Sequence, residues 1–284
     1  MAKDPDWDGL AGELARTAGR GGKRGAELLR QRVPRLHAEI ACLRESDWPI
    51  ACWGQSHNFD EIVQQRIVEP QVLRTIGNVA GVTLPSSSCH SGLLHTYGYL
   101  LSVIDTPYGK KRDRWLRPTL AQGFGFGARV LRVMPDQGTL LHNVTWLLAR
   151  IAFRDDPKWL RRLRKSCGHV SDLVVDYSYR KLKITRIQES VRLADRRLVE
   201  LCTELVPFPC KRSKANHALL IYWCRTTRTG KRLLTAFPVS QAWMAERVAL
   251  ARQPNVAARV RFNGQIDGFA TERPARSSTS TGTG

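Results

Sequence analysis

Residues 218–239 read ALLIYWCRTTRTGKRLLTAFPV, and this stretch decides the fold that the sequence predicts. Two apolar runs, 218–223 and 233–239, flank a polar segment, 225–230, that is rich in Thr and ends in Gly. Short apolar runs on either side of a turn are typical of a β-hairpin. Ser240 follows the second run, and Ser is a favoured N-cap, so we expect a helix through Trp243, Met244 and Val248.

Most of the elements predicted before the hairpin are helices, because apolar residues recur there with a helical period. Pro34 and Pro70 are expected to break or kink two of these helices. A last strand is expected at 258–262, before the turn signal Asn263-Gly264. The predicted helices cover residues 26–43, 59–76, 90–104, 139–153, a segment that starts at Pro157, and 189–205.

The sequence therefore predicts an α+β fold, with a mostly helical N-terminal two-thirds and a small C-terminal part that contains an antiparallel β-hairpin. Four regions follow from composition and pattern. We expect a flexible basic arm at 1–23, in which a short helix around 10–16 is the alternative, and a mainly helical region at 24–206. An α+β region with the hairpin at 207–270 and a disordered Ser/Thr/Gly-rich tail at 271–284 complete the chain. One continuous fold across residue 207 is the alternative to a domain boundary there.

The charge of the chain is strongly positive. The 284 residues include 45 Lys and Arg but only 25 Asp and Glu, which gives a net charge of +20, and residues 205–245 contain no acid. A field of this strength attracts polyanions, so nucleic acid or another anionic ligand is the expected partner. The competing explanation is an Arg-rich composition without a functional cause.

Several classes of protein are disfavoured by the sequence. The seven Cys residues form no CxxC pair, so a structural zinc finger is not expected and no metal ligands are assigned. Neither a signal-peptide pattern nor an apolar stretch long enough for a membrane span is found, so we expect a cytoplasmic protein without a membrane partner. The sequence fixes neither a cofactor nor an oligomeric state.

Residues 86–114, SSSCHSGLLHTYGYLLSVIDTPYGKKRDR, hold the densest group of chemically useful side chains. We predict His95 and His90 as acid–base groups, since His can shuttle a proton near neutral pH, with Tyr97 assisting. Lys and Arg after the Thr106-Pro107 turn are expected to bind a phosphate or carboxylate. The predicted substrate-binding residues of this segment are Tyr99, Tyr108, Lys110, Lys111, Arg112 and Arg114.

The same residues also fit a purely structural role. In that alternative His95, Tyr97 and Leu101 are core residues, and Lys110–Arg114 is a solvated surface. The hairpin is a second basic element, and its Arg225 and Arg228 are expected to contact the anionic ligand.

Three functional hypotheses result. The first is an enzyme acting on nucleic acid or another phosphate-bearing substrate by His-mediated acid–base chemistry, with a nuclease-like hydrolase as one form. The second is a non-catalytic nucleic-acid-binding protein, and the third is a small-molecule biosynthetic enzyme with an anionic substrate. A binding constant that falls steeply with salt separates the second from the third.

Overall fold

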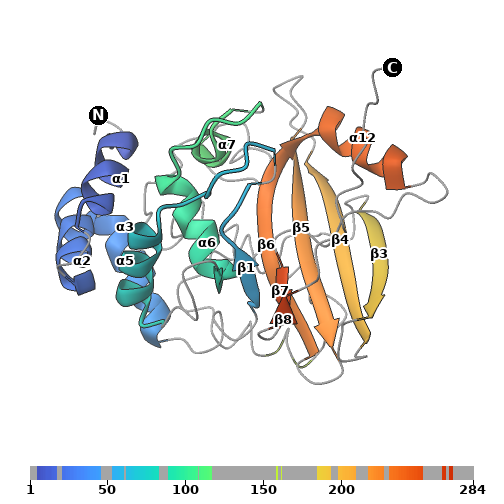
Figure 1. Ribbon diagram of the computed structural model, residues 1–284, viewed down its shortest axis with the longest axis horizontal. Coiled ribbons are helices and arrows are strands. Elements are labelled where there is room, and N and C mark those ends of the chain that lie inside the picture. The colour runs from blue at the N-terminus through green and yellow to red at the C-terminus, as the bar shows by residue number, and fades with distance from the viewer. Residues whose placement is uncertain are drawn as a thin grey trace, which may run out of the picture.

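The computed structural model describes residues 5–17, 21–45, 53–60, 62–82, 89–107, 109–116, 158, 161, 184–192, 198–208, 217–226, 230–251, 264–266 and 269–270. Within these residues the protein is α+β. Helices from the N-terminal half form one side of the molecule, and a four-stranded antiparallel sheet forms the other (Figure 1).

Four helices make up the helical side. They are α1 (Trp7–Ala15), α2 (Gly21–Arg32), α3 (Pro34–Cys42) and α5 (Pro70–Ala80), and a short 3₁₀ turn, η1 (Leu43–Glu45), follows α3. Asp6 caps α1 by accepting a hydrogen bond from the Gly9 N–H, and proline opens both α3 and α5. Gly81 ends α5 in the left-handed conformation, with φ of 72°.

A small sheet and three short helical segments lie between the two sides. The sheet has the order β2-β1-β7-β8, from β1 (Gln55–His57), β2 (Cys89–Ser91), β7 (Gly264–Ile266) and β8 (Phe269–Ala270). The chain leaves β2 directly into α6 (Gly92–Gly98), the 3₁₀ turn η2 (Tyr99–Leu101) and then α7 (Lys111–Leu116).

The large sheet is a meander in which sequential strands are neighbours. Its strands are β3 (Thr185–Arg192), β4 (Leu198–Phe208), β5 (His217–Thr226) and β6 (Gly230–Ser240). Helix α12 (Gln241–Ala251) follows, capped by the Ser240 hydroxyl, which accepts from the Trp243 N–H at 3.1 Å. Both faces of the sheet are buried, and Trp243, Met244 and Val248 of α12 pack against one of them.

One hydrophobic cluster joins the helical side to the other face of the sheet. It contains Leu14, Leu29 and Ile76 from the helices together with Ile221 and Trp223 from β5. The junction is tight because Gly54 and Gly92 lie directly against β6. The Gly54 N–H donates to the Leu233 carbonyl at 2.6 Å, and a Cβ on Gly92 would lie 2.1 Å from the Leu234 carbonyl oxygen.

The predicted hairpin and the capped helix after it are confirmed by β5, β6 and α12. The predicted break at Pro34 is also confirmed, because α2 ends at Arg32 and α3 begins at Pro34. The helix predicted at 139–153, the strand at 258–262 and the tail at 271–284 lie outside the described residues. So does much of the segment 117–183, and the mostly helical N-terminal two-thirds therefore stays a prediction.

The helix predicted at 189–205 is wrong, because these residues belong to β3 and β4. Strand β4 is buried on both faces: Leu201 and Leu205 belong to one hydrophobic cluster, and Cys202 and Val206 belong to the other. The apolar residues of β4 at 198, 199, 201, 202, 205 and 206 are separated by Glu200, Thr203 and Glu204 at a helical spacing, so the sequence pattern also fits a helix. Strand β4 also runs through the predicted boundary at residue 207.

Two N-terminal predictions also need correction. Residues 7–15 of the expected flexible arm form α1, whose Trp7, Leu10 and Leu14 are buried in the core. The helix predicted at 59–76 begins only at Pro70. Before it the chain forms a loop, in which the Asn58 side chain pairs with the backbone N–H and carbonyl of Val68.

Candidate functional site

His95 lies on α6 and is completely buried. Its Nδ1 is 2.9 Å from the hydroxyl oxygen of Ser56 on β1, and its ring centroid lies 4.5 Å from that of Tyr99. Ser56 is also fully buried. The predicted acid–base residue is therefore part of the contact between α6 and the small sheet, as the structural alternative expected.

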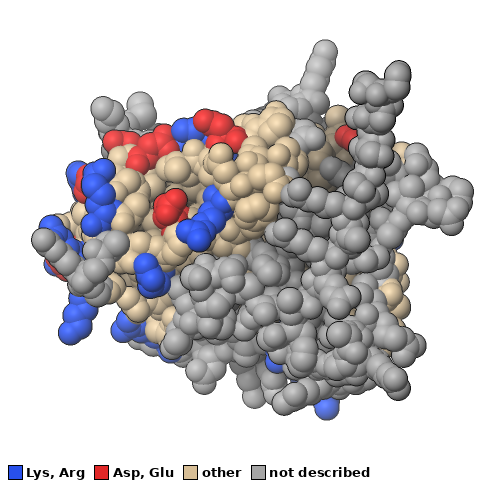
Figure 2. All heavy atoms as spheres, in the orientation of Figure 1, with Lys and Arg blue, Asp and Glu red and all other residues tan. Residues whose placement is uncertain are grey.

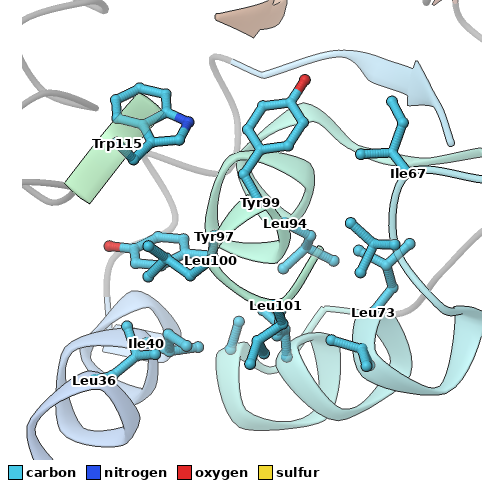
Figure 3. Packing of buried hydrophobic residues seen from close by; sticks show 14 of the residues in the cluster. Leu36, Ile40, Ile67, Leu73, Leu94, Tyr97, Tyr99, Leu100, Leu101 and Trp115 are labelled. Carbon is cyan, nitrogen blue, oxygen red and sulfur yellow. The ribbon is translucent and has the colours of Figure 1, made fainter. Parts of the chain in front are cut away.

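Tyr97 lies on the side of Leu36 and Ile40 of α3, as Figure 3 shows. Its hydroxyl donates to the Glu39 carboxylate at 2.9 Å, and both residues are buried. Burial and the neighbouring Glu39 charge raise the pKa of Tyr97 well above its usual value. The neutral phenol of Tyr97 therefore makes a structural hydrogen bond to a buried carboxylate. Tyr97 does not share a site with His95.

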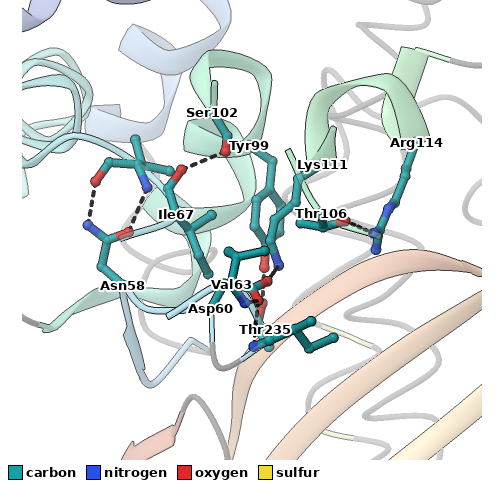
Figure 4. Close-up of polar contacts among 12 residues, drawn as sticks. Asn58, Asp60, Val63, Ile67, Tyr99, Ser102, Thr106, Lys111, Arg114 and Thr235 are labelled. Carbon is teal, nitrogen blue, oxygen red and sulfur yellow. Dashed lines mark hydrogen bonds and ion pairs between the residues drawn. The ribbon is translucent and has the colours of Figure 1, made fainter. Parts of the chain in front are cut away.

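Tyr99 and Lys111 meet beside β6, in the polar cluster of Figure 4. The Tyr99 hydroxyl lies 3.2 Å from the Thr235 hydroxyl, and burial raises the pKa of Tyr99. The Lys111 ammonium lies 5.6 Å from the centroid of the Tyr99 ring and 5.5 Å from that of Phe237. Its carboxylate partner is Asp60, with Nζ and Oδ2 2.8 Å apart.

Asp60 is held on both sides. Its Oδ1 accepts the backbone N–H groups of Ile62 and Val63, at 2.9 and 3.2 Å. Burial by itself raises the pKa of Asp60, but the charge and hydrogen bond of Lys111 and these two N–H groups outweigh it, and the pKa is lowered. Burial lowers the pKa of Lys111, against the effect of Asp60. The pair joins the start of α7 to the loop after β1.

Lys110 and Arg112 form ion pairs with a carboxylate of α1, that of Asp8. Both terminal nitrogens of Arg112 donate to Asp8, at 2.9 and 3.2 Å, and Lys110 Nζ lies 3.1 Å from Asp8 Oδ2. The Arg112 hydrogen bonds lower the pKa of Asp8. Arg114 donates to the Thr106 hydroxyl at 2.9 Å. The basic run therefore fastens α7 to α1 and to its own preceding turn.

The remaining predicted site residues are dispersed. His90 lies on β2, with its Cα opposite that of Ser56. Arg225 is exposed on β5, where it pairs with Glu200 at 3.6 Å. Tyr108 and Arg228 lie outside the described residues. Among the described residues, no group of three or more His, Cys, Asp or Glu is placed to hold a metal ion.

The partners of these residues could not be identified from the order of residues alone. Ser56, Asp60 and Thr235 were not predicted site residues, and neither were Asp8 and Glu39. Asp8, for example, lies more than 100 positions before Arg112, and only the fold brings them together. One feature of the sequence could have drawn attention to this region: the polar run Gln55-Ser56-His57-Asn58, which includes Ser56 and directly precedes Phe59 and Asp60.

Comparison with known proteins returns no relative. No protein-family model, no curated protein and no solved structure matches this chain. None of the helices in the described part of the chain has the length and apolar character needed to cross a membrane.

Proposed function

We propose that this protein binds nucleic acid through exposed Lys and Arg side chains, and that His95 and Tyr97 do no chemistry on it. Three carboxylates, those of Glu39, Asp60 and Glu204, are buried, and this placement carries the proposal. Two of them pair with buried groups: Asp60 lies 2.8 Å from the Lys111 ammonium, and Glu39 accepts a hydrogen bond from the Tyr97 hydroxyl. Carboxylates that are buried with internal partners do not neutralise the Lys and Arg side chains exposed on the surface.

Many Lys and Arg side chains are exposed on the surface. Figure 2 shows Lys and Arg around the helical end of the molecule, while most of the Asp and Glu visible on this face are grouped along its upper edge. A positive surface of this kind supplies the salt-dependent, sequence-independent part of nucleic-acid affinity. The exposed cations include Arg16, Lys23, Arg24, Arg30, Arg32, Arg35, Arg44, Arg66, Arg74, Lys158, Arg161 and Arg225.

The hypothesis of His-mediated catalysis has less support. A general acid or base must come within hydrogen-bond reach of the group it protonates, about 2.6–3.2 Å. His95 has no exposed surface, and Tyr97 is 1% exposed and donates to Glu39. Neither is placed to meet a polymer on the outside of the protein.

Labelled RNA and DNA, incubated with the protein at two salt concentrations and scored for both retention and cleavage, test the proposal. We expect retention that weakens steeply as salt rises, because bound cations release counterions from the phosphates, and no cleavage. Tyr97→Phe, which removes one hydroxyl and keeps the ring, should retain nucleic acid as the parent does. Absence of retention at low salt would overturn the proposal, as would cleavage that Tyr97→Phe abolishes.

A further inference from the structure

We propose that the outer face of α2 and the start of α3 is the docking surface for a nucleic-acid double helix, held by its phosphate backbone. This inference rests on the nucleic-acid binding proposed above and names the surface and the form of the ligand. The residues of this α2–α3 basic face are Lys23, Arg24, Arg30, Arg32 and Arg35.

The geometry of α2 directs three of these cations, Lys23, Arg24 and Arg30, outward. Gly25 and Leu29 are buried on the inner side of the helix, which packs against α5. A Cβ on Gly25 would lie 2.2 Å from the Thr75 hydroxyl, so the two helices are in close contact along this side. Positions 23, 24, 27 and 30 then fall on the opposite side of the helix, because residues three or four apart share a face.

The face carries a clear excess of positive charge. Residues 21–38 contain five Lys or Arg but a single carboxylate, Glu27, and all five cations are exposed. Arg30 pairs with Glu27, and Arg32 pairs with Glu13 of α1, yet these two side chains remain 61% and 58% exposed.

The other three cations of the face have no such partner among the described residues. Lys23, Arg24 and Arg35 form no ion pair with any residue in the described part of the chain. Within the described part of the chain, no carboxylate therefore competes with phosphates for these three charges.

The form of the nucleic acid follows from the composition of the α2–α3 basic face, because residues 21–38 contain no Phe, Tyr or Trp. Binding of single strands usually relies on exposed aromatic rings on which bases stack. The large hydrophobic side chains exposed among the described residues are Ile62, Val103 and Leu198, and none of these is aromatic. Cations without stacking rings suit a duplex, whose bases are already stacked and whose phosphates face outward.

The dimensions agree with this ligand. Helix α2 has 12 residues and is about 18 Å long at 1.5 Å per residue. At about 3.4 Å per phosphate along one strand, this length spans about five phosphates. The face is therefore long enough for several backbone contacts.

The hairpin end of the large sheet is the competing basic surface, and its cations are more engaged. Arg225 pairs with Glu200, and both Arg225 and Lys231 lie over the Trp223 ring, at 5.8 and 3.9 Å from its centroid. Trp223 itself is buried, so its ring is closed to a base. This surface makes a suitable internal comparison for the α2–α3 basic face.

The test compares two triple variants that lose the same positive charge. Lys23→Gln/Arg24→Gln/Arg35→Gln removes the three unpaired cations of the face, and Lys158→Gln/Arg161→Gln/Arg225→Gln removes three exposed cations elsewhere. Binding of a mixed-sequence DNA duplex and of one of its single strands is measured by fluorescence anisotropy over a range of salt. Circular dichroism establishes that both variants are folded as the parent is.

We expect the parent to prefer the duplex. The face variant should lose about two to three units of the slope of log K against log salt and bind about 10- to 100-fold more weakly, while the other variant keeps most of the slope. An unchanged slope in the face variant overturns this inference, and so does an equal loss in both variants or a preference for the single strand. If the parent binds neither form, the proposed function fails instead.

Discussion

At the residue scale, burial decides how the charged side chains of this protein are used. The side chains of Lys111 and Asp60 are only 10% and 9% exposed, and their 2.8 Å contact is surrounded by the rings of Tyr99 and Phe237. Moving both charges out of water costs several kcal/mol per ion, which their attraction and the N–H groups of Ile62 and Val63 offset. The pair is therefore a tie between α7 and the loop after β1.

Removing one member of this pair should be more harmful than removing both. Lys111→Met leaves the Asp60 carboxylate buried without the ammonium, so we expect about 3–5 kcal/mol lower free energy of unfolding. In Asp60→Asn/Lys111→Met no charge remains, and most of that loss should be recovered. Urea unfolding followed by tryptophan fluorescence measures both variants, and equal losses in the single and double variants would show that the pair is not coupled.

The pH dependence gives an independent check on the same pair. The pKa of Asp60 is lower in the folded protein than in the unfolded chain, where it is about 3.9. The unfolded state therefore takes up a proton first, and the stabilisation is present above about pH 4 and is lost as the pH falls toward the folded-state pKa. Asp60→Asn should show a shallower loss of stability between about pH 5 and pH 3 than the parent.

At the element scale, glycines set how closely the helices approach. Gly25 of α2 lies against Thr75 of α5, where a methyl group would come within 2.2 Å of the Thr75 hydroxyl and 3.1 Å of its Cβ. A Cβ on Gly12 of α1 would make only an ordinary van der Waals contact, with Arg16 Nη1 at 3.6 Å. Comparing substitutions at these two positions therefore distinguishes the effect of helix packing on stability from the effect of helix propensity.

Gly25→Ala and Gly12→Ala should therefore change stability in opposite directions. Both gain the intrinsic preference of Ala over Gly for a helix, about 1 kcal/mol. Gly25→Ala must also push α2 from α5, and overpacking of this kind costs about 1–3 kcal/mol, so we expect a net loss. Thermal unfolding of the two variants side by side measures the difference, and stabilisation of both would mean that α2 does not pack closely on α5.

At the scale of the whole molecule, one hydrophobic cluster crosses from the helical side to the sheet. Trp7 and Trp115 lie in its helical part and Trp223 on β5, while Trp53 lies at the junction with β6. A shared core of this kind makes independent unfolding of the two sides costly, because each would expose the apolar face of the other.

We therefore expect a single cooperative unfolding transition. Far-ultraviolet circular dichroism and tryptophan fluorescence should give the same urea midpoint, since the tryptophans report on both sides and the junction. Gly92→Ala, whose methyl would meet the Leu234 carbonyl oxygen at 2.1 Å, should lower this one midpoint without splitting the transition. Two separate midpoints in the parent protein would contradict a shared core.

Local features of the fold were predictable from residue order. The hairpin 218–239 and the helix after Ser240 follow from apolar runs, a turn and a cap, all of which act within about ten residues. The break between α2 and α3 follows from Pro34. Strand β4 was not predictable in this way, because a strand buried on both faces and a buried helix have the same apolar composition.

The candidate site shows the same division. The sequence by itself determined the charge of +20, the hairpin and the clustering of His, Tyr and basic residues in 86–114, because these are properties of composition and near neighbours. Only the tertiary structure decided that His95 is buried against Ser56, that Tyr97 meets Glu39 and that Arg112 meets Asp8. These partners are between 39 and 104 positions apart, and burial and long-range pairing depend on the packing of the whole chain, which no local pattern encodes.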